Sequence, residues 1–451
     1  MTKILIKGGT IVSMDPVTGD LECGDILINN DRIEAIASSI SDESAQKIDA
    51  TGCILFPGLV NAHTHTWQTA LRGVTSNWTL LEYFKNMHAG LATNFVPDDI
   101  YIANMMGALN QINCGTTTLG DWCHNNPTPD HTNRGIDGIM DSGIRAVFFH
   151  GSPKPDPKPG QKHFSEIPHP RSEIERLLKA RFQNPQSLVT LGMAILGPHY
   201  STYDVAVHDF LLAREYGLIA SMHCAGAEAK TPDGWERLAK DGLLGSNNNI
   251  VHGNNLTDQQ LQMMIDLGVT FSITPEMEMT QGHGYPITGR LLKLGSAPSL
   301  GVDLESGISG DMFTVARMAM GMQRAFDNAA SKEQFGKLPD TSTIHCREAL
   351  EWITIRGAQA LKMEEEIGSL KVGKKADIVM IRASDLNMCP VHDPVTSVLM
   401  QTSLSNIDTV IINGEIKKQG GKLLHQGIEE GKEKLKTSGK RLLKQLNSVI
   451  H

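Results

Sequence analysis

The sequence has no uncharged apolar run of the roughly 18 residues that a membrane-spanning helix needs. Its first stretch, MTKILIKGGTIVSMD, also lacks the long apolar segment of a secretory signal peptide. The chain has seven cysteines, and none forms a CxxC pair, which is typical of reduced thiols in a cytosolic protein. We therefore expect a cytoplasmic protein with no membrane partner.

An excess of positive charge is also absent. The 451 residues carry a formal charge of −9, which gives no reason to expect nucleic acid or an anionic membrane as a partner. No GxGxxG motif opens a βαβ unit, so the usual signal for dinucleotide binding is missing. The length suits one large barrel or α/β body with an accessory domain.

Strand-like segments lie near both ends of the chain. Residues 1–57 alternate in part between apolar and polar positions and are punctuated by Gly, Asn and Asp, and a second strand-rich segment covers residues 366–425. We expect these two segments to form one small β-sandwich domain. The last stretch, residues 426–451, reads as a charged amphipathic helix whose outer face is solvated or contacts another subunit, and we expect a homo-oligomer.

Between these segments, residues 58–365 alternate short β-rich runs with helix-like stretches. This rhythm indicates an α/β fold with a parallel sheet. Its length suits a (β/α)₈ barrel with insertions, and an open doubly wound sheet is the main alternative. The predicted fold class is thus α/β, a TIM-type barrel with a β-sandwich domain built from both chain ends.

Several of the β-rich runs end in a residue that can bind a metal or carry a proton. In a TIM barrel the C-terminal ends of the strands converge on one mouth, where the active site lies. Histidine and aspartate residues occupying these ends therefore predict one shared site. These residues are His63, His65, His199, His223, His252 and Asp303.

Three imidazoles and a carboxylate suit a Zn²⁺-type ion with an open coordination position for water. Such an ion lowers the pKa of bound water to about 7 and so supplies a hydroxide nucleophile at neutral pH. Imidazole ligands also suit Fe²⁺, so the sequence leaves both metals open.

Motifs along nearly the whole chain resemble the amidohydrolase superfamily, and within it the cytosine/adenosine deaminase-related branch that includes S-adenosylhomocysteine deaminases and triazine hydrolases. The motifs that carry this resemblance are FPGLVNAHTHTWQTALRG, GTTTLGDW, GPHYST, MHCA, VHGNNL, SLGVD, GSLKVGKKADIVMI and VIINGE. The resemblance implies a (β/α)₈ barrel with a β-sandwich from both termini, in agreement with the split β segments.

The resemblance also implies roles for individual residues. The implied metal ligands are His63, His65, His223 and Asp303. Asp303 would also take a proton from the metal-bound water, and His252 would polarise the substrate or hold it beside the metal. His199 matches a substrate-contacting position. No lysine follows LGMAILGP, where binuclear members carry a carboxylated lysine, and this favours one metal ion.

The sequence departs from the branch at two strand ends. The fifth strand of a deaminase usually carries His-x-x-Glu, but this chain has HCAGAEAK, which places Gly226 at the Glu position and Glu228 two residues later. The seventh strand has TPEMEMTQGHGYP in place of Pro-x-Ser-Asn. Glu276, Glu278 and His283 are therefore candidates for a replacement acid or a substrate contact. We favour Glu276 over Glu228 as the proton donor or substrate contact.

Three further side chains follow predicted strands near the mouth. His124 in GDWCHNN is expected to contact the substrate, and Trp67 and Trp78 are candidates for the wall of an apolar or aromatic substrate pocket.

These observations predict a metal-dependent hydrolase in which bound hydroxide attacks a carbon–nitrogen bond of a heterocyclic or cyclic-amide small molecule. Asp303, His252 and Glu276 are the predicted catalytic residues, and Glu228 is a predicted substrate contact. Hydrolysis of an amide, a carbamate or a carbon–halogen bond at the same site is one alternative. A decarboxylase on the same fold is an alternative from another enzyme class.

Overall fold

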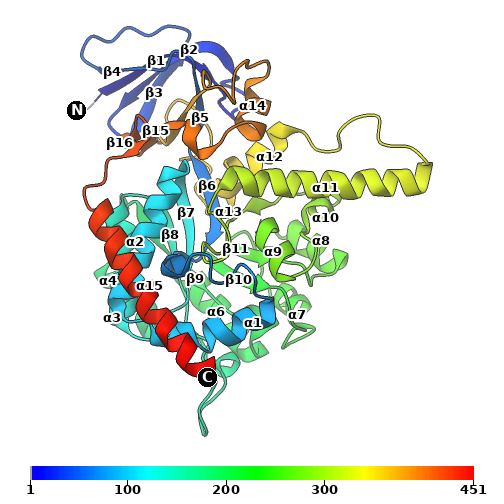
Figure 1. Cartoon of the computed structure of the whole chain (residues 1–451). Helices are drawn as coiled ribbons and strands as arrows, with labels where there is room; N and C mark the ends of the chain where they lie inside the picture. The colour runs from blue at the N-terminus through cyan, green and yellow to red at the C-terminus, as the bar shows by residue number, and fades with distance from the viewer. Residues whose placement is uncertain (1–2, 451) are drawn as a thin grey trace. The chain divides into compact units, whose positions relative to one another are not determined.

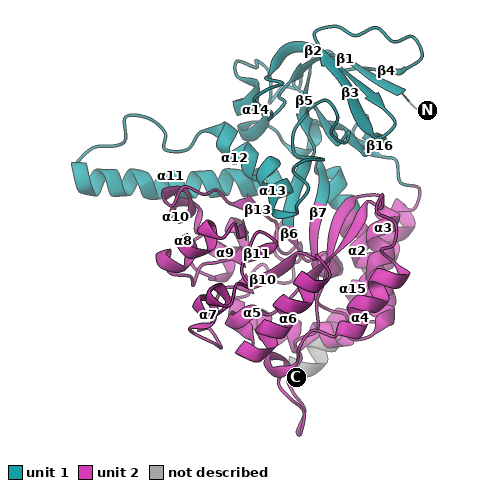
Figure 2. Ribbon diagram, turned by 180° about the vertical axis from the view of Figure 1, so that it is seen from behind, with its two compact units in different colours: residues 1–62, 109–118, 311–425 teal, residues 63–108, 119–310, 426–451 magenta. Residues whose placement is uncertain are grey.

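The computed structural model describes residues 3–450, with side chains to residue 444. The chain forms two compact units, which Figure 2 distinguishes by colour. Unit 1 comprises residues 1–62, 109–118 and 311–425, and unit 2 comprises residues 63–108, 119–310 and 426–451. Every residue predicted for the site belongs to unit 2.

One sheet of eight strands forms the barrel, in the order β13-β12-β11-β10-β9-β8-β7-β6. The strands are β6 (Leu59–Thr64), β7 (Thr116–Cys123), β8 (Arg145–His150), β9 (Val189–Ala194), β10 (Ala220–Cys224), β11 (Asn248–His252), β12 (Thr270–Ile273) and β13 (Ser299–Leu300). Consecutive strands from β8 to β13 pair in parallel. A parallel bridge between Thr64 and Asp303 joins the two ends of the sheet.

Helices alternate with these strands along the chain (Figure 1). They include α2 (Pro97–Asn113), α3 (Pro129–Ser142), α4 (Arg171–Ala180), α6 (Tyr203–Glu215), α7 (Gly234–Lys240), α8 (Asp258–Asp266), α9 (Pro275–Gln281), α10 (Thr288–Lys293) and α11 (Met312–Phe335). Parallel strands require such crossovers, because a tight hairpin can join only antiparallel strands. The predicted (β/α)₈ barrel is confirmed.

The second sheet combines strands from both ends of the chain, in the order β17-β16-β15-β14-β5-β1-β2-β3, with β4 paired to β1. Its strands are β1 (Lys3–Ile11), β2 (Leu21–Asn29), β3 (Arg32–Ala37), β4 (Gln46–Asp49), β5 (Cys53–Pro57), β14 (Ile378–Arg382), β15 (Ile407–Ile412), β16 (Glu415–Gln419) and β17 (Lys422–Leu423). The antiparallel pairing of β5 with β14 joins the two segments, with Phe56 opposite Val379. The predicted association of strands from both chain ends is confirmed, and these strands form one mixed sheet.

Alternation along the strands of this sheet places isoleucines in a shared core. Ile4 and Ile6 on β1, Ile26 and Ile28 on β2 and Ile378 on β14 are all buried in it. Side chains two residues apart on a strand share a face. The period-two pattern of the sequence therefore explains why these distant segments form one sheet.

The predicted C-terminal helix is present as α15 (Ile428–Ile450). Within unit 2 it packs beside two short helical turns, η1 (Thr66–Leu71) and η3 (Leu91–Asn94). Ser438 donates a hydrogen bond to the Asp99 carboxylate at 2.7 Å, and Arg441 donates to the carbonyl of Asn94 at 3.1 Å. None of the helices in the described part of the chain is both long and apolar enough to cross a membrane.

Candidate metal centre and catalytic pocket

The four predicted metal ligands converge at the C-terminal ends of the barrel strands. His63 is on β6, His223 is on β10, and His65 and Asp303 follow β6 and β13. The Nε2 atoms of His63 and His223 are 3.3 Å apart. The Nε2 atoms of His63 and His65 each lie 3.4 Å from Oδ1 of Asp303.

These separations fit a bound cation. Four ligand atoms around a tetrahedral Zn²⁺, with bonds of about 2.0–2.1 Å, are about 3.3–3.4 Å apart. Burial lowers the pKa values of His63, His65 and His223 and so favours neutral imidazoles, the form that binds a metal. His63 belongs to two candidate metal-binding groups, one with His65 and Asp303 and one with His223 and His252, and within each group the ligand atoms lie within 4.8 Å of one another. Neutral imidazoles with one carboxylate are a donor set that suits a Zn²⁺-type ion.

Asp303 supplies the negative charge of this set. Burial by itself would raise the pKa of its carboxyl group, but the contacts with His63, His252 and His65 lower it well below its usual value. Asp303 is therefore ionised at neutral pH, as both a metal ligand and a proton acceptor must be.

A backbone hydrogen bond selects the tautomer of His65. Its Nδ1 lies 2.6 Å from the carbonyl oxygen of Trp122, which can only accept, so Nδ1 carries the hydrogen and Nε2 is left as the ligand atom. A buried carboxylate fixes the chain directly after His65, because Asp121 accepts hydrogen bonds from the amide and hydroxyl of Thr66 at 3.1 and 2.7 Å.

Two backbone hydrogen bonds hold Asp303 against β6. The amide of Asp303 donates to the carbonyl of His63 at 3.0 Å, and the amide of His65 donates to the carbonyl of Asp303 at 2.7 Å. This close approach requires Gly301, since a Cβ there would lie 2.4 Å from the oxygen of His63. Asp303 and His252 both have a φ of +67°, in the left-handed region that only the surrounding structure can impose on such residues.

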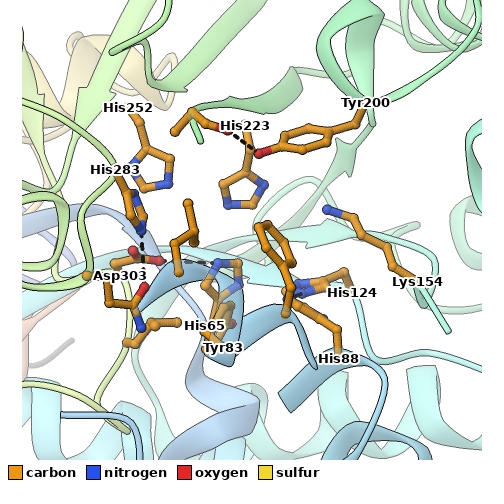
Figure 3. Close-up of a pocket in the computed structure, with 15 residues that line it drawn as sticks. His65, Tyr83, His88, His124, Lys154, Tyr200, His223, His252, His283 and Asp303 are labelled. Atoms are coloured by element: carbon orange, nitrogen blue, oxygen red, sulfur yellow. Dashed lines mark hydrogen bonds and ion pairs between the residues drawn. The ribbon is translucent and has the colours of Figure 1, made fainter. Parts of the chain in front are cut away.

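A cavity of about 40 Å³, shown in Figure 3, lies beside the predicted ligands. Its wall includes three of the predicted ligands and adds aromatic, imidazole and amine groups from several loops. Besides His65, His223 and Asp303, the lining residues are Leu80, Tyr83, Phe84, His88, His124, Lys154, Tyr200, Ala225, His252, Gln281, His283 and Leu304. A typical ligand pocket is about 300 Å³ or larger. The space beside the ligands therefore has the size of a few water molecules.

Three of the other predicted residues, His124, His252 and His283, line this cavity. The imidazoles of His252 and His124 line it, and their ring centroids lie 5.4 and 6.3 Å from that of His223. Burial lowers the pKa of His124 well below its usual value. His283, a candidate from the seventh strand end, packs edge-on against His252 at 4.6 Å, and burial lowers its pKa to about 3.

The predicted contacts Trp67 and His199 are buried but do not line the cavity. Trp67 packs edge-on against His124 at 5.4 Å, so it supports a wall residue. The Nε2 of His199 lies 3.1 Å from the carbonyl oxygen of Ala225. Its neighbour Tyr200 lines the cavity instead. Trp78, a candidate for the pocket wall, follows η1 and is partly exposed.

The carboxylates proposed to replace the missing glutamate take different positions. β10 ends at Cys224 and Gly226 has a φ of +84°, so the chain turns before Glu228, which is exposed. Glu276 lies on the first turn of α9, outside the residues that line the cavity. Glu278, two residues further along α9, is fully buried and contacts His252.

Several cavity residues have no counterpart in the sequence analysis. Tyr83 and His88 come from α1 (Leu80–Tyr83) and the short helix η2 (Phe84–His88), and Lys154 comes from the loop after β8. Tyr200 belongs to the GPHYST motif, in which the sequence pointed to its neighbour His199 and not to Tyr200 itself. The others do not directly follow a strand end, and neither spacing nor periodicity singles them out.

Lys154 is a cation held between aromatic rings. Its Nζ lies 5.5 Å from the ring centroid of Trp122 and 5.1 Å from that of Tyr200, within the range of cation–π attraction. Burial lowers its pKa to about 8. Burial is the only cause of this shift, so no carboxylate among the described residues offsets the cost of the buried charge.

Comparison with known proteins agrees with this geometry. A sequence model of the amidohydrolase family matches residues 54–417. The chain is 26% identical over 437 residues to a 5-methylthioadenosine/S-adenosylhomocysteine deaminase of Caldicellulosiruptor saccharolyticus, which covers 93% of this chain and 94% of the relative. It is 28% identical over 444 residues to a 5′-deoxyadenosine deaminase of Methanobrevibacter smithii, which covers 95% of each chain.

Solved structures support the fold. A zinc-complexed atrazine chlorohydrolase from Arthrobacter aurescens superposes with a TM-score of 0.85 at 22% identity, covering 97% of this chain and 100% of the other. An adenosine deaminase from Xanthomonas campestris with bound zinc gives a TM-score of 0.83 at 20% identity, covering 98% and 99% of the two chains.

Proposed function

Because the chain belongs to the amidohydrolase family, we propose that it removes an amino group by hydrolysis from the purine ring of an adenosine-like nucleoside. The superfamily and the enzyme class predicted from the sequence, a hydrolase of carbon–nitrogen bonds, are confirmed by the family match and the curated relatives. The substrate class is inferred from those relatives, which align with this chain over nearly its full length.

The observation that carries the proposal is the cluster of His63, His65 and Asp303, in which each imidazole lies 3.4 Å from the carboxylate, with His223 3.3 Å from His63. We propose one divalent ion at this set, Zn²⁺ in preference to Fe²⁺, because zinc is present in structurally similar proteins. When bound, such an ion supplies a strong nucleophile at neutral pH by lowering the pKa of water.

The side chains around this set supply the remaining steps. Water adds to the ring carbon that bears the amino group, and the ionised Asp303 accepts the proton that the water gives up. His252 holds the reacting group in place, and the developing negative charge is stabilised within the buried site. Transfer of a proton to the amine then allows the carbon–nitrogen bond to break, which releases ammonia and leaves the oxo product.

Access to the reacting atoms requires a change in the cavity wall. A nucleoside does not fit in about 40 Å³, so part of the wall must move when the substrate binds. The segment that carries Leu80, Tyr83 and Phe84 is the proposed moving part, since it forms one side of the cavity and is built only of the short helices α1 and η2.

The remaining predicted roles are kept as proposals. His124 faces the cavity and is well placed to contact a substrate, whereas Trp67 and His199 act through neighbours that do line it. Glu276 remains the proposed proton donor or substrate contact, and Glu228 remains the second choice. A cytoplasmic location and a homo-oligomer also remain predictions.

Gly226 favours a second candidate reaction at the same site. Without a carboxylic acid at this position, the site suits a leaving group that departs without a proton, such as chloride on a triazine ring. The chemistry at Asp303 and His252 would be the same. The decarboxylase alternative would instead release carbon dioxide.

The products of the purified, zinc-loaded protein distinguish these reactions. We expect ammonia release from 5′-deoxyadenosine, 5-methylthioadenosine or S-adenosylhomocysteine, and no carbon dioxide from carboxylated heterocycles. Chloride release from a chlorotriazine without ammonia release from any nucleoside would replace deamination by the second candidate. Loss of ammonia release in the His63→Ala variant is the control that ties activity to the metal set.

A further inference from the structure

Glu278 is a buried carboxylate in direct contact with a cavity histidine. Its side chain is 0% exposed, and its Oε1 lies 3.2 Å from Nδ1 of His252. The carboxylate lies on α9, which follows β12, while His252 ends β11. A buried carboxylate is costly unless hydrogen-bond donors surround it, so the groups around Glu278 indicate its role.

Backbone and amide donors fix the carboxylate in place. Its Oε1 accepts a hydrogen bond from the amide of Thr274 at 2.8 Å, and its Oε2 accepts one from the side-chain amide of Asn254 at 3.3 Å. The amide of Glu278 in turn donates to the carbonyl of Thr274 at 2.9 Å. These bonds anchor the side chain to the first turn of α9 and to the loop after β11.

The acceptor character of the carboxylate determines where His252 carries its hydrogen. A carboxylate oxygen has no hydrogen to donate, so Nδ1 of His252 must be the donor. The hydroxyl oxygen of Thr274 also lies 3.1 Å from Nδ1. If that hydroxyl donated to an unprotonated Nδ1 instead, the lone pair of Nδ1 would face the carboxylate oxygen at 3.2 Å, and the two acceptors would repel each other.

The other ring nitrogen, Nε2, is then free to act in the cavity. The imidazole of His252 projects into it beside His223 (Figure 3), with ring centroids 5.4 Å apart. We propose that Glu278 is a positioning residue that fixes the orientation and tautomer of His252, so that Nε2 accepts a hydrogen bond from the reacting group. This role rests on the proposed function, and it assigns the holding of the substrate to Glu278 and His252 acting together.

A purely structural role for Glu278 predicts a different response to substitution. The Oε1 atom of Glu278 contacts both the amide of Thr274 and Nδ1 of His252, so a glutamine whose oxygen replaces Oε1 keeps both contacts and removes only the charge. A methionine has a similar length and no comparable acceptor, so Glu278→Met removes both contacts and leaves the hydroxyl of Thr274 as the partner of Nδ1. A purely structural role would lower the thermal midpoint of Glu278→Met and leave the tautomer of His252 unchanged.

The test is ¹⁵N NMR of histidine-labelled protein, metal-free and zinc-loaded, with the His252 signals assigned by their absence in His252→Gln. We expect a protonated Nδ1 in the wild type and in Glu278→Gln, and a protonated Nε2 in Glu278→Met, where the hydroxyl of Thr274 can donate to Nδ1. In Glu278→Met kcat should fall about 10²–10⁴-fold, as tautomer reversal does in a histidine–aspartate pair. KM and zinc content should stay near the wild-type values, and Glu278→Gln should keep most of the turnover.

Glu236→Met is the matched control, since this glutamate on α7 is exposed and its change removes the same charge. The control should leave the His252 spectrum and turnover unchanged. A wild-type spectrum with Nε2 protonated would overturn the proposal, even if Glu278→Met failed to fold. Turnover within a fewfold of wild type in a folded Glu278→Met would also overturn it. If the wild type showed no deaminase activity, the proposed function would fail, while the spectra would still decide the tautomer.

Discussion

The side chain of Leu80 occupies the space that a side chain at position 226 would enter. A Cβ atom built on Gly226 would lie 2.6 Å from Cδ2 of Leu80 and 4.0 Å from the hydroxyl oxygen of Tyr200. The left-handed backbone at Gly226, with a φ of +84°, adds a second obstacle to any larger residue. The sequence therefore lacks the glutamate that the resemblance implies, and Leu80 occupies the space that its side chain would need.

The Gly226→Glu variant tests this relationship. We expect it to lose about 1–3 kcal/mol of stability, from backbone strain and overlap with Leu80, and to gain no deaminase activity. Urea unfolding measures the loss. In a Leu80→Ala background, Gly226→Glu should cost less stability than it does in the wild type, because the overlap is gone. The part of the loss that comes from backbone strain should remain. A Gly226→Glu enzyme that matches the wild type in stability, or exceeds it in turnover, would contradict this account.

Asp303→Asn should separate turnover from folding. The substitution is nearly isosteric, so the barrel should remain folded, but it removes the proton acceptor and the anionic ligand together. Turnover should fall about 10²–10⁴-fold. Steady-state kinetics of the zinc-saturated variant measures this loss. Asp258→Asn, a change on the surface of α8, is the control and should leave turnover unchanged. Activity within a fewfold of wild type at full zinc occupancy would show that another group accepts the proton.

Lys154 provides a prediction about stability and pH. Burial lowers its pKa from 10.5 to about 8, so the folded protein bears the cost of a buried charge below pH 8. Between pH 8 and 10.5 the unfolded chain binds the proton and the folded chain does not, so this cost declines as the pH rises. Lys154→Met should therefore stabilise the protein by about 1–3 kcal/mol at pH 7, and by less at pH 10.

Urea unfolding of Lys154→Met and the wild type at both pH values measures this difference. Lys162→Met, which removes an exposed lysine from the same loop, serves as the control and should change stability little at either pH. A stabilisation by Lys154→Met that is equal at pH 7 and pH 10 would mean that the charge of Lys154 is not the cause.

The sequence predicts that the His and Asp side chains of the candidate metal centre cluster, because they lie at or just after the ends of strands. His63, His223 and Asp303 follow runs of apolar residues, and parallel strands in a barrel bring their C-terminal ends together whatever the loops do. The split sheet was predictable for a similar reason, since period-two alternation near both termini leaves apolar faces that need a partner. Hydrophobic pattern and strand direction are sufficient for both.

The cavity wall was not predictable in the same way. Leu80, Lys154 and Glu278 lie on loops or short helices, whose paths depend on tertiary contacts and not on periodicity. Strand alternation suggested that Glu228 shares a face with Gly226 if β10 continues that far, but the strand ends at Cys224. Glu276 and Glu278 differ by two positions on α9, and only the helix geometry shows which of them contacts His252.

The stoichiometry of metal follows from the ligand set. We expect one divalent ion per chain in the wild type, since no lysine is available at the end of β9 to bridge a second one. In His63→Ala, occupancy should fall to a small fraction, because the lost imidazole contacts both His223 and Asp303. Elemental analysis after dialysis measures this. Two ions in the wild type, or nearly full occupancy in the variant, would require a different site.

The most direct test of the whole account is a zinc titration of chelator-treated protein while ammonia release from 5′-deoxyadenosine is followed. Ammonia release should be absent without metal, rise in proportion to added zinc and reach its plateau at one equivalent per chain. No ammonia at any zinc level, or a rate that needs a second equivalent, would contradict a deaminase built on His63, His65, His223 and Asp303.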